Sequence, residues 1–367
     1  MKLLISAGEA SGDQRAAEVL SALKRNSSDN VEAFGLGGIR LAAEGMKLTH
    51  NLSSYAVMGF GEILRSLGRF LRLEKDLKDL CAGERPDCIL LVDFPGFNMR
   101  LGRWAKKEGI PVVHYVAPQM WAWGRWRVRK LKKSTDILLT LFSFEEHFFN
   151  ERGVRTVFTG HPLIKQIPLQ TNNGKALGLL PGSREQEVEK LLPAMLQAFT
   201  LLRKMGLVDK ALLAVSDHLD KSVYMEAENT EGVILLEGTG QVLSRSRAAL
   251  VCSGTATLET ALYGVPFVVC YKTSSITYAL ARFLVKGVKN IGLANIIAED
   301  DVAPELIQNN VTPANMVKYT ESLFSSSRAW EKAVQRLSKV RSSLGNGDPA
   351  ENAAREIIAF MERIDES

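Results

Sequence analysis

DCILLVD, residues 87–93, is the stretch that decides the fold class, because five apolar residues stand there between two aspartates. Its hydrophobicity is continuous instead of alternating, which indicates a strand buried on both faces, as in a parallel sheet. Helical spacing over residues 16–23 and 60–80 separates several runs of this kind, so the pattern strand, helix, strand predicts a doubly wound α/β fold. The other runs of the first half are KLLISAG (2–8), EAFGLGG (32–38), VVHYVAP (112–118), DILLTLF (136–142) and TVFTGHP (156–162).

The same pattern starts again after a polar linker near residues 165–174, with ALGLLPG (176–182), ALLAVS (211–216), GVILLEG (232–238), AALVCSG (248–254) and PFVVCYK (266–272). A chain of 367 residues also exceeds the usual size of one hydrophobic core. We therefore expect two Rossmann-like domains, 1–168 and 169–345, with the ligand in a cleft between them at the carboxyl ends of the strands. A last helix in 346–367 should pack back on the N-terminal domain.

The totals place the chain among ordinary globular proteins, with 46% apolar and 24% charged residues. Four scattered cysteines without a CxxC pair fit a reducing compartment. The first apolar run is too short for a signal peptide, and no run approaches the roughly 18 residues of a spanning helix. These features predict a cytoplasmic protein whose membrane contact, if any, is peripheral.

The positive charge is concentrated in one segment. The formal net charge is only +5, yet residues 100–133 hold ten Lys or Arg and a single acid. Within them, WAWGRWRVRKLKK (121–133) carries three of the five tryptophans. Aromatic residues mixed with cations suit either a lipid headgroup layer or a nucleic acid. The predicted membrane patch comprises Trp121, Trp123, Arg125, Trp126, Arg127 and Arg129, with the helical stripe of Phe60, Leu64 and Leu67, although ordinary amphipathic helices have similar stripes.

Two turns of the second half predict a nucleotide site. Gly182, Ser183 and Arg184 follow one strand and precede a helix, where free backbone N–H groups attract an anion that a guanidinium can grip. Ser253, Gly254 and Thr255 repeat the device, and Glu259, one turn further on, suits the two hydroxyls of a ribose. The alternatives are an ordinary turn with a solvated arginine and a buried polar turn. Two such turns in one half favour a nucleotide over a nucleic acid.

Acidic residues at strand ends mark the first half. Glu9, Ser11 and Asp13 follow the first strand, where Ser11 and Asp13 also suit helix capping. Asp93 ends DCILLVD and suits a general base, or else simply forms a turn. His114 and His161 either face the site or serve as core residues. No D-x-D, HExxH or Cys/His spacing is present, so we expect no metal site.

Taken in order, SAGEASGD (6–13), AVMG (56–59), VDFPGFN (92–98), HYVAPQMWAW (114–123), LLPGSREQEV (179–188), SGTATLE (253–259) and PFVVCYK (266–272) resemble the lipid-A-disaccharide synthase family over nearly the whole chain. The resemblance implies a GT-B glycosyltransferase that inverts the anomeric centre without a metal or cofactor. Its donor would be UDP-2,3-diacylglucosamine and its acceptor 2,3-diacylglucosamine 1-phosphate. Both are lipids, which implies work at the anionic cytoplasmic face of the inner membrane and no nucleic-acid partner.

The resemblance also assigns roles. Asp93 would be the base for the acceptor 6-hydroxyl, and Arg184 would neutralise the departing UDP. The family's nucleotide turn corresponds to Ser253, Thr255 and Glu259, and a further substrate-binding asparagine to Asn295. Its amino-terminal motif near the reacting sugars corresponds to Glu9, as a catalytic residue, and to Ser11 and Asp13, as substrate-binding residues. Gly96 departs from the family, since many members carry an acid there. The alternative within the class is another UDP-sugar enzyme, such as a peptidoglycan-precursor N-acetylglucosaminyltransferase.

Overall fold

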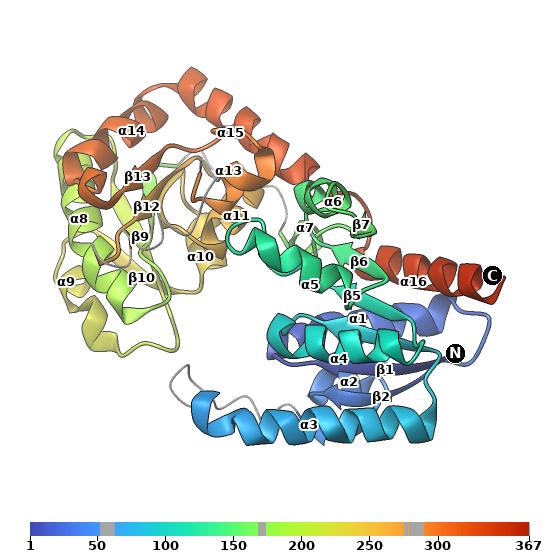
Figure 1. The fold of residues 1–367 in the computed structure, drawn as a ribbon. Coiled ribbons are helices and arrows are strands. Elements are labelled where there is room, and N and C mark those ends of the chain that lie inside the picture. The colour runs from blue at the N-terminus through green and yellow to red at the C-terminus, as the bar shows by residue number, and fades with distance from the viewer. Residues whose placement is uncertain (52–62, 168–173, 275–277, 279–289, 367) are drawn as a thin grey trace. The chain divides into compact units, whose positions relative to one another are not determined.

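The structure is a computed structural model that describes residues 1–51, 63–167, 174–274, 278 and 290–366 (Figure 1). The chain forms two compact units. The first contains residues 1–162 and 345–367, and the second contains residues 163–344. The expected domain limits were 168 and 345.

The first unit is built on a parallel sheet with the strand order β3-β2-β1-β4-β5-β6-β7. Its order reverses between β1 and β4, the kind of switch point at which doubly wound sheets bind their ligands. The strand DCILLVD is β4, buried along its length, and β1 and β5 flank it in parallel register. The strands are β1 (Lys2–Ala7), β2 (Glu32–Gly37), β3 (Lys47–Asn51), β4 (Cys88–Val92), β5 (Val112–Tyr115), β6 (Ile137–Thr140) and β7 (Thr156–Phe158).

Helices cover both faces of this sheet, which explains the continuous hydrophobicity of its strands. Leu3 and Ile5 point into one apolar cluster with α1 and α16, whereas Leu4 points into another with α3 and α4. The helices are α1 (Ala10–Asn26), α2 (Ile39–Ala43), α3 (Ile63–Glu84), α4 (Pro95–Lys107), α5 (Val128–Lys132), α6 (Ser143–Asn150) and α16 (Pro349–Asp365), with a 3-10 turn η2 (Arg125–Arg127).

The second unit repeats the architecture with a parallel sheet in the order β10-β9-β8-β11-β12-β13, which reverses between β8 and β11. The predicted fold class of two doubly wound parallel-sheet domains is therefore confirmed. The strands are β8 (Ala176–Leu180), β9 (Lys210–Val215), β10 (Val233–Glu237), β11 (Ala248–Cys252), β12 (Phe267–Tyr271) and β13 (Glu305–Ile307).

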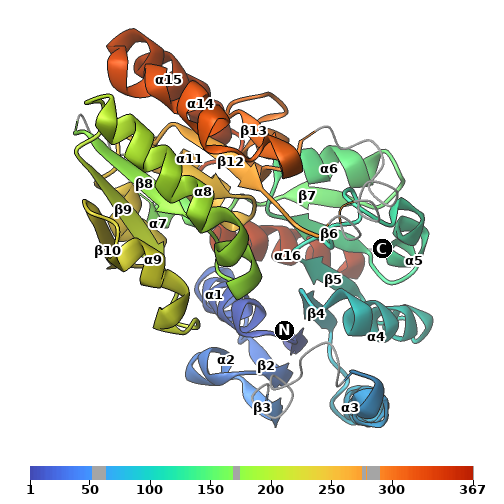
Figure 2. The ribbon, with the colours of Figure 1, turned by 90° about the vertical axis from the view of Figure 1, so that its left-hand side faces the viewer.

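One face of this second sheet packs on α8, which lies beside α14 (Figure 2). Val188, Leu191 and Met195 of α8 are buried there against Leu177 and Leu179. The helices are α7 (Leu163–Gln166), α8 (Glu185–Lys204), α9 (Met225–Glu228), α10 (Thr239–Leu243), α11 (Thr255–Leu262), α13 (Leu293–Ala298), α14 (Pro313–Ser325) and α15 (Ser327–Ser342).

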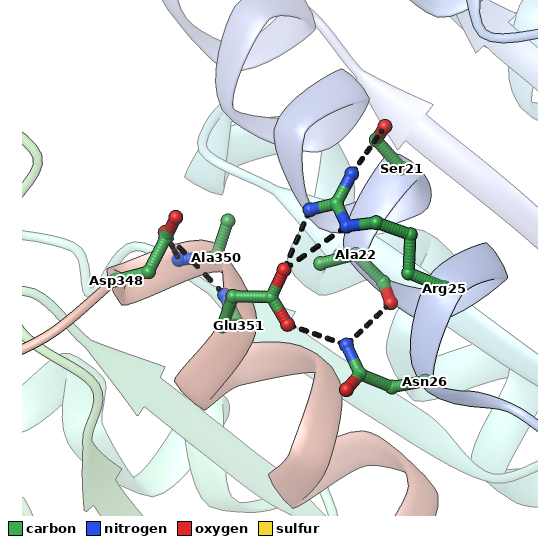
Figure 3. A network of polar contacts seen from close by, with 7 residues as sticks. All are labelled: Ser21, Ala22, Arg25, Asn26, Asp348, Ala350 and Glu351. Atoms are coloured by element: carbon green, nitrogen blue, oxygen red, sulfur yellow. Dashed lines mark hydrogen bonds and ion pairs between the residues drawn. The ribbon is translucent and has the colours of Figure 1, made fainter.

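The last helix, α16, packs on α1 of the first unit. A polar clasp closes this contact (Figure 3). The Glu351 carboxylate accepts hydrogen bonds from Arg25 Nε at 3.1 Å and Nη2 at 2.6 Å, and from the Asn26 amide. Asp348 caps α16 by accepting from the Ala350 N–H at 2.9 Å. The chain thus returns to its first helix after completing the second unit.

We expect Glu351→Gln to lower the melting temperature at pH 7 by about 1–3 °C, because it removes the ion pair with Arg25. The effect is small because this ion pair is partly exposed. The hydrogen bonds from Arg25 and Asn26 hold the pKa of Glu351 below its ordinary value of 4.5. A carboxylate whose pKa is lower in the folded state stabilises the fold at pH values above its unfolded-state pKa. This contribution is lost as the pH falls through the folded-state pKa. Thermal melts should therefore show the difference at pH 7 shrinking below about pH 4.5.

The matched control is Glu362→Gln, which removes an exposed charge from the same helix. Equal shifts for the two variants, or a Glu351→Gln shift that persists in acid, would contradict a contribution from the clasp.

Candidate active site

A cavity of about 480 Å³ lies in the second unit at the carboxyl ends of β8, β9, β10 and β11. It spans the switch point between β8 and β11, where the strand order predicts a ligand. Seven of the predicted residues line it: Gly182, Ser183, Arg184, Ser253, Gly254, Thr255 and Glu259.

The first turn of this cavity, between β8 and α8, already holds an anion that belongs to the chain. The Glu187 carboxylate accepts from the N–H groups of Ser183 at 3.1 Å and Arg184 at 3.4 Å, and from the Arg184 guanidinium at 2.9 Å. Gly182 is required there, since its φ is +120° and a Cβ would collide with the Glu187 side chain. The prediction that these N–H groups are free is wrong, because Glu187 closes a capping box on them.

The second turn, between β11 and α11, leaves its helix start open. The first N–H groups of a helix have no partner within it, and those of Thr255 and Ala256 belong to residues that line the cavity. Gly254 has a φ of +152°, which favours glycine. The Ser253 hydroxyl donates to the Ile291 carbonyl at 2.9 Å. This turn therefore offers its backbone to an anion, while the Ser253 hydroxyl holds the neighbouring chain.

Sequence reasoning missed the cavity residues that follow β9 and β10. Ser216, Asp217 and His218 come after β9, and Gly238 and Thr239 come after β10. The sequence does indicate these residues, since in ALLAVS and GVILLEG an apolar strand also ends in a small or polar residue. The turns at 182–184 and 253–255 have the same pattern.

Asp93 stands in the first unit directly after β4, at that sheet's switch point. Asp93 and Phe94 have φ values of +54° and +49°, a left-handed conformation that non-glycine residues rarely adopt. Such strain persists where surrounding contacts fix it, and it is concentrated at functional sites. Here the buried Asn98 amide donates to the Asp93 carbonyl at 2.8 Å and the Val92 carbonyl at 3.3 Å. Asn98 is a further residue that sequence reasoning did not single out.

One cation, Arg15, and one acid, Glu9, interact electrostatically with the Asp93 carboxylate. Arg15 Nη1 lies 3.9 Å from Asp93 Oδ2, beyond hydrogen-bonding distance. Partial burial, and then the negative charge of Asp93, raise the pKa of Glu9, while Arg15 opposes the rise. Glu9 and Asp93 are thus close enough to interact, as a pair of acids with one cation. Arg15 was not predicted, although it lies one helical turn after Ser11.

Ser11 and Asp13 have different surroundings. Ser11 is exposed on the first turn of α1. Asp13 is buried, and its carboxylate accepts from the N–H groups of Gly38 at 2.7 Å, Arg40 at 3.0 Å and Leu41 at 3.3 Å. Asp13 therefore caps α2, a helix 25 residues away in sequence, which explains its burial without a ligand.

Three other polar candidates are buried. His114 has a pKa lowered to about 3 and His161 a pKa lowered to about 4, both mainly through burial. His161 also stacks on Phe142, with ring centroids 5.0 Å apart. These features favour the core interpretation of both histidines. Asn295 is 1% exposed, bonds with Ala303 and Glu305, and is not among the residues that line the cavity.

The basic tryptophan segment forms η2 and α5 on the first unit, and one of its tryptophans corrects the predicted patch. Trp121 is 8% exposed, and its Nε1 donates to buried Glu145 at 3.0 Å, so it is a core residue. Burial raises the pKa of Glu145 to about 8, although the Trp121 hydrogen bond opposes the rise. Trp123 and Trp126 are 53% and 67% exposed.

Cations cover both exposed tryptophan rings. The Arg127 guanidinium lies 5.2 Å from the Trp123 ring centroid, and Lys130 Nζ lies 5.0 Å from that of Trp126. Arg125 and Arg129 are also exposed. Phe60 lies outside the described residues, and Leu64 and Leu67 lie in α3 at positions whose side chains are likewise not described. Across the described residues, no helix is long and apolar enough to cross a membrane, and no group of three or more His, Cys, Asp or Glu could hold a metal.

Solved structures define the class of the fold. The UDP-GlcNAc 2-epimerase from Neisseria meningitidis, bound to UDP-GlcNAc, matches with a TM-score of 0.62 at 16% identity, covering 99% of this chain and 100% of that one. The calicheamicin glycosyltransferase matches with a TM-score of 0.60 at 16% identity, covering 99% and 98%. The two parallel-sheet units and the strand-end cavity therefore define a protein of the GT-B fold.

Sequence comparison identifies the family within that class. The family model described as lipid-A-disaccharide synthetase matches residues 3–358. The lipid-A-disaccharide synthase of Myxococcus xanthus is 36% identical over 377 residues, covering 98% of this chain and 97% of that protein. The chain belongs to the lipid-A-disaccharide synthase family.

Proposed function

We propose that the chain transfers 2,3-diacylglucosamine from UDP-2,3-diacylglucosamine to the 6-hydroxyl of 2,3-diacylglucosamine 1-phosphate, with inversion and without a metal. The products are UDP and a β-1,6-linked lipid A disaccharide 1-phosphate. The observation that carries this proposal is the cavity at the switch point of the second unit. It combines an open helix start with an arginine, the chemistry that a nucleoside diphosphate requires.

In this proposal the second unit stabilises the departing UDP. Negative charge grows on the diphosphate as the bond from the anomeric carbon to its oxygen breaks. The N–H groups of Thr255 and Ala256 and the Arg184 guanidinium supply opposite charge. Arg184 is 81% exposed at its side chain, so a ligand can reach it. At the first turn, the Glu187 carboxylate accepts hydrogen bonds from the Ser183 N–H and the Arg184 guanidinium. A diphosphate that binds there replaces this carboxylate as the acceptor.

The first unit supplies the base. Asp93 takes the proton of the 6-hydroxyl while that oxygen forms its bond to the anomeric carbon on the face opposite UDP. Attack from that face inverts the configuration. The strained turn held by Asn98 places the carboxylate at the end of β4, and Arg15 provides a cation near it. Glu9, whose pKa is raised, accompanies Asp93 as the second acid of the site.

The rate of UDP release tests this function directly. With acceptor and EDTA present, we expect acylated UDP-glucosamine to be turned over on the order of 10² times faster than the unacylated sugar nucleotide, because contacts with remote parts of a substrate contribute to catalysis. Equal rates for the two donors would contradict the lipid specificity, and loss of activity in EDTA would contradict a metal-free reaction.

We also propose that η2 and α5 hold the protein on the anionic cytoplasmic face of the inner membrane. Exposed tryptophans beside several cations suit the headgroup layer, where each basic residue contributes about 1 kcal/mol. This surface consists of Trp123, Trp126, Arg125, Arg127 and Arg129, whereas Trp121 is buried and bonded to Glu145.

Changing Arg125, Arg127 and Arg129 together to Glu is expected to reduce binding to anionic vesicles at least about a hundredfold, since three favourable charges become unfavourable. Co-sedimentation with vesicles of phosphatidylglycerol and phosphatidylethanolamine measures this. The control changes Arg328, Lys332 and Arg336 of α15 to Glu, with the same change in net charge on other exposed residues. Equal losses for both triple variants would reduce the effect to net charge and contradict a defined surface.

A further inference from the structure

Glu259 is held by a hydroxyl from another helix. The Thr239 hydroxyl donates to Glu259 Oε2 at 2.5 Å, and both residues line the cavity. Thr239 is the first residue of α10, whereas Glu259 lies in the second turn of α11. A hydrogen bond of this length to an ionised carboxylate is among the stronger ones in proteins.

The two helices approach closely at this contact. A Cβ on Gly240, the residue after Thr239, would lie 2.8 Å from the hydroxyl of Tyr263, which follows α11. Thr239 has no capping function, since the cap position of α10 is Gly238. The Thr239 hydroxyl is therefore directed to the cavity carboxylate and not to its own helix.

This arrangement has a consequence for a bound nucleotide. A glutamate side chain has several rotatable bonds, and fixing them costs free energy when a ligand binds. A carboxylate accepts about four hydrogen bonds. Thr239 takes one of them on Oε2, which fixes the group and leaves the other positions for neighbouring hydroxyls of a ligand.

We propose that Thr239 is a positioning residue that presents Glu259 to the ribose hydroxyls of the uridine nucleotide, and so sets the preference for ribonucleotides over 2′-deoxyribonucleotides. The inference rests on the proposed function, because it places a uridine nucleotide in the cavity. The inference adds Thr239, the first residue of α10, to the residues that recognise the ribose.

Calorimetric titration of the full-length protein with UDP and with 2′-deoxy-UDP tests the inference. The wild type should prefer UDP by about tenfold, the worth of one hydrogen bond to a charged group. In Thr239→Val the affinity for UDP should fall by about tenfold, while that for 2′-deoxy-UDP changes much less, so the preference nearly disappears. Thr239→Ser keeps the hydroxyl and should keep the preference.

The control is Thr200→Val on α8, whose hydroxyl bonds to the Leu196 carbonyl of its own helix. It should leave both affinities unchanged. Equal losses for the two nucleotides in Thr239→Val would make Thr239 a structural support and overturn the inference, as would loss of the preference in Thr239→Ser. A wild type that binds UDP without any preference would overturn the inference alone. A wild type that binds neither nucleotide would overturn the proposed function and the inference with it.

Discussion

Asp93→Asn is expected to lower kcat by about 10²–10⁴-fold, the usual contribution of a positioned general base. The amide has nearly the same shape and can still accept from the Phe94 N–H, which Asp93 Oδ1 accepts at 3.0 Å, but it cannot take the proton of the acceptor. Affinity for UDP should stay within about twofold, since the cavity that would bind it belongs to the second unit. Steady-state kinetics and UDP titration measure the two effects separately.

The control for Asp93 is Asp13→Asn, which changes a carboxylate of the same unit that caps α2. This variant should lower the melting temperature and leave the kcat of the folded protein nearly unchanged. If Asp93→Asn instead unfolded the protein, or lost UDP binding together with turnover, Asp93 would be a structural residue and the assignment of the base would fall.

Arg184→Ala is expected to lower kcat by about 10²-fold, because a preorganised cation near the leaving group contributes a few kcal/mol to the transition state. Binding of UDP should weaken more than binding of uridine, which has no diphosphate. Arg184→Lys should recover part of the activity as a single point charge. Titration with the two ligands and steady-state rates provide the measurements.

Glu187→Gln serves as the matched variant, since it removes the ion pair of Arg184 and leaves the guanidinium in place. It should retain most of the activity that Arg184→Ala loses. A loss of the same size in both variants would mean that the pair matters only for the turn between β8 and α8, and unaltered kinetics in Arg184→Ala would remove it from the mechanism.

Much of the fold could be predicted because parallel strands that are buried on both faces appear in the sequence as continuous apolar runs. DCILLVD became β4, and the repeat of the pattern after residue 174 became the second sheet. The strand ends also indicated the cavity, since Arg184 and Ser253 follow β8 and β11 on either side of the order reversal. Local order was enough for these inferences.

Partners distant in sequence could not be predicted. Asp13 finds its three N–H donors at the start of α2, and Trp121 finds Glu145 on α6, so neither burial was visible in the local pattern. Glu187 was close enough in sequence, but a capping carboxylate and a ligand suit the same N–H groups, so the local pattern does not distinguish them. In the structure the Glu187 carboxylate accepts from these groups. The tryptophan segment likewise divides into one core residue and two exposed ones.

The place of α16 affects how the protein is made. The second unit is one uninterrupted stretch, residues 163–344, and can complete its core once that stretch has left the ribosome. The sheet of the first unit is synthesised first, but the core of this unit is complete only when Ala353, Ile357 and Phe360 cover α1. Until translation reaches α16, the apolar face of α1 that these side chains cover stays exposed. The order of synthesis and the order of completion are therefore reversed.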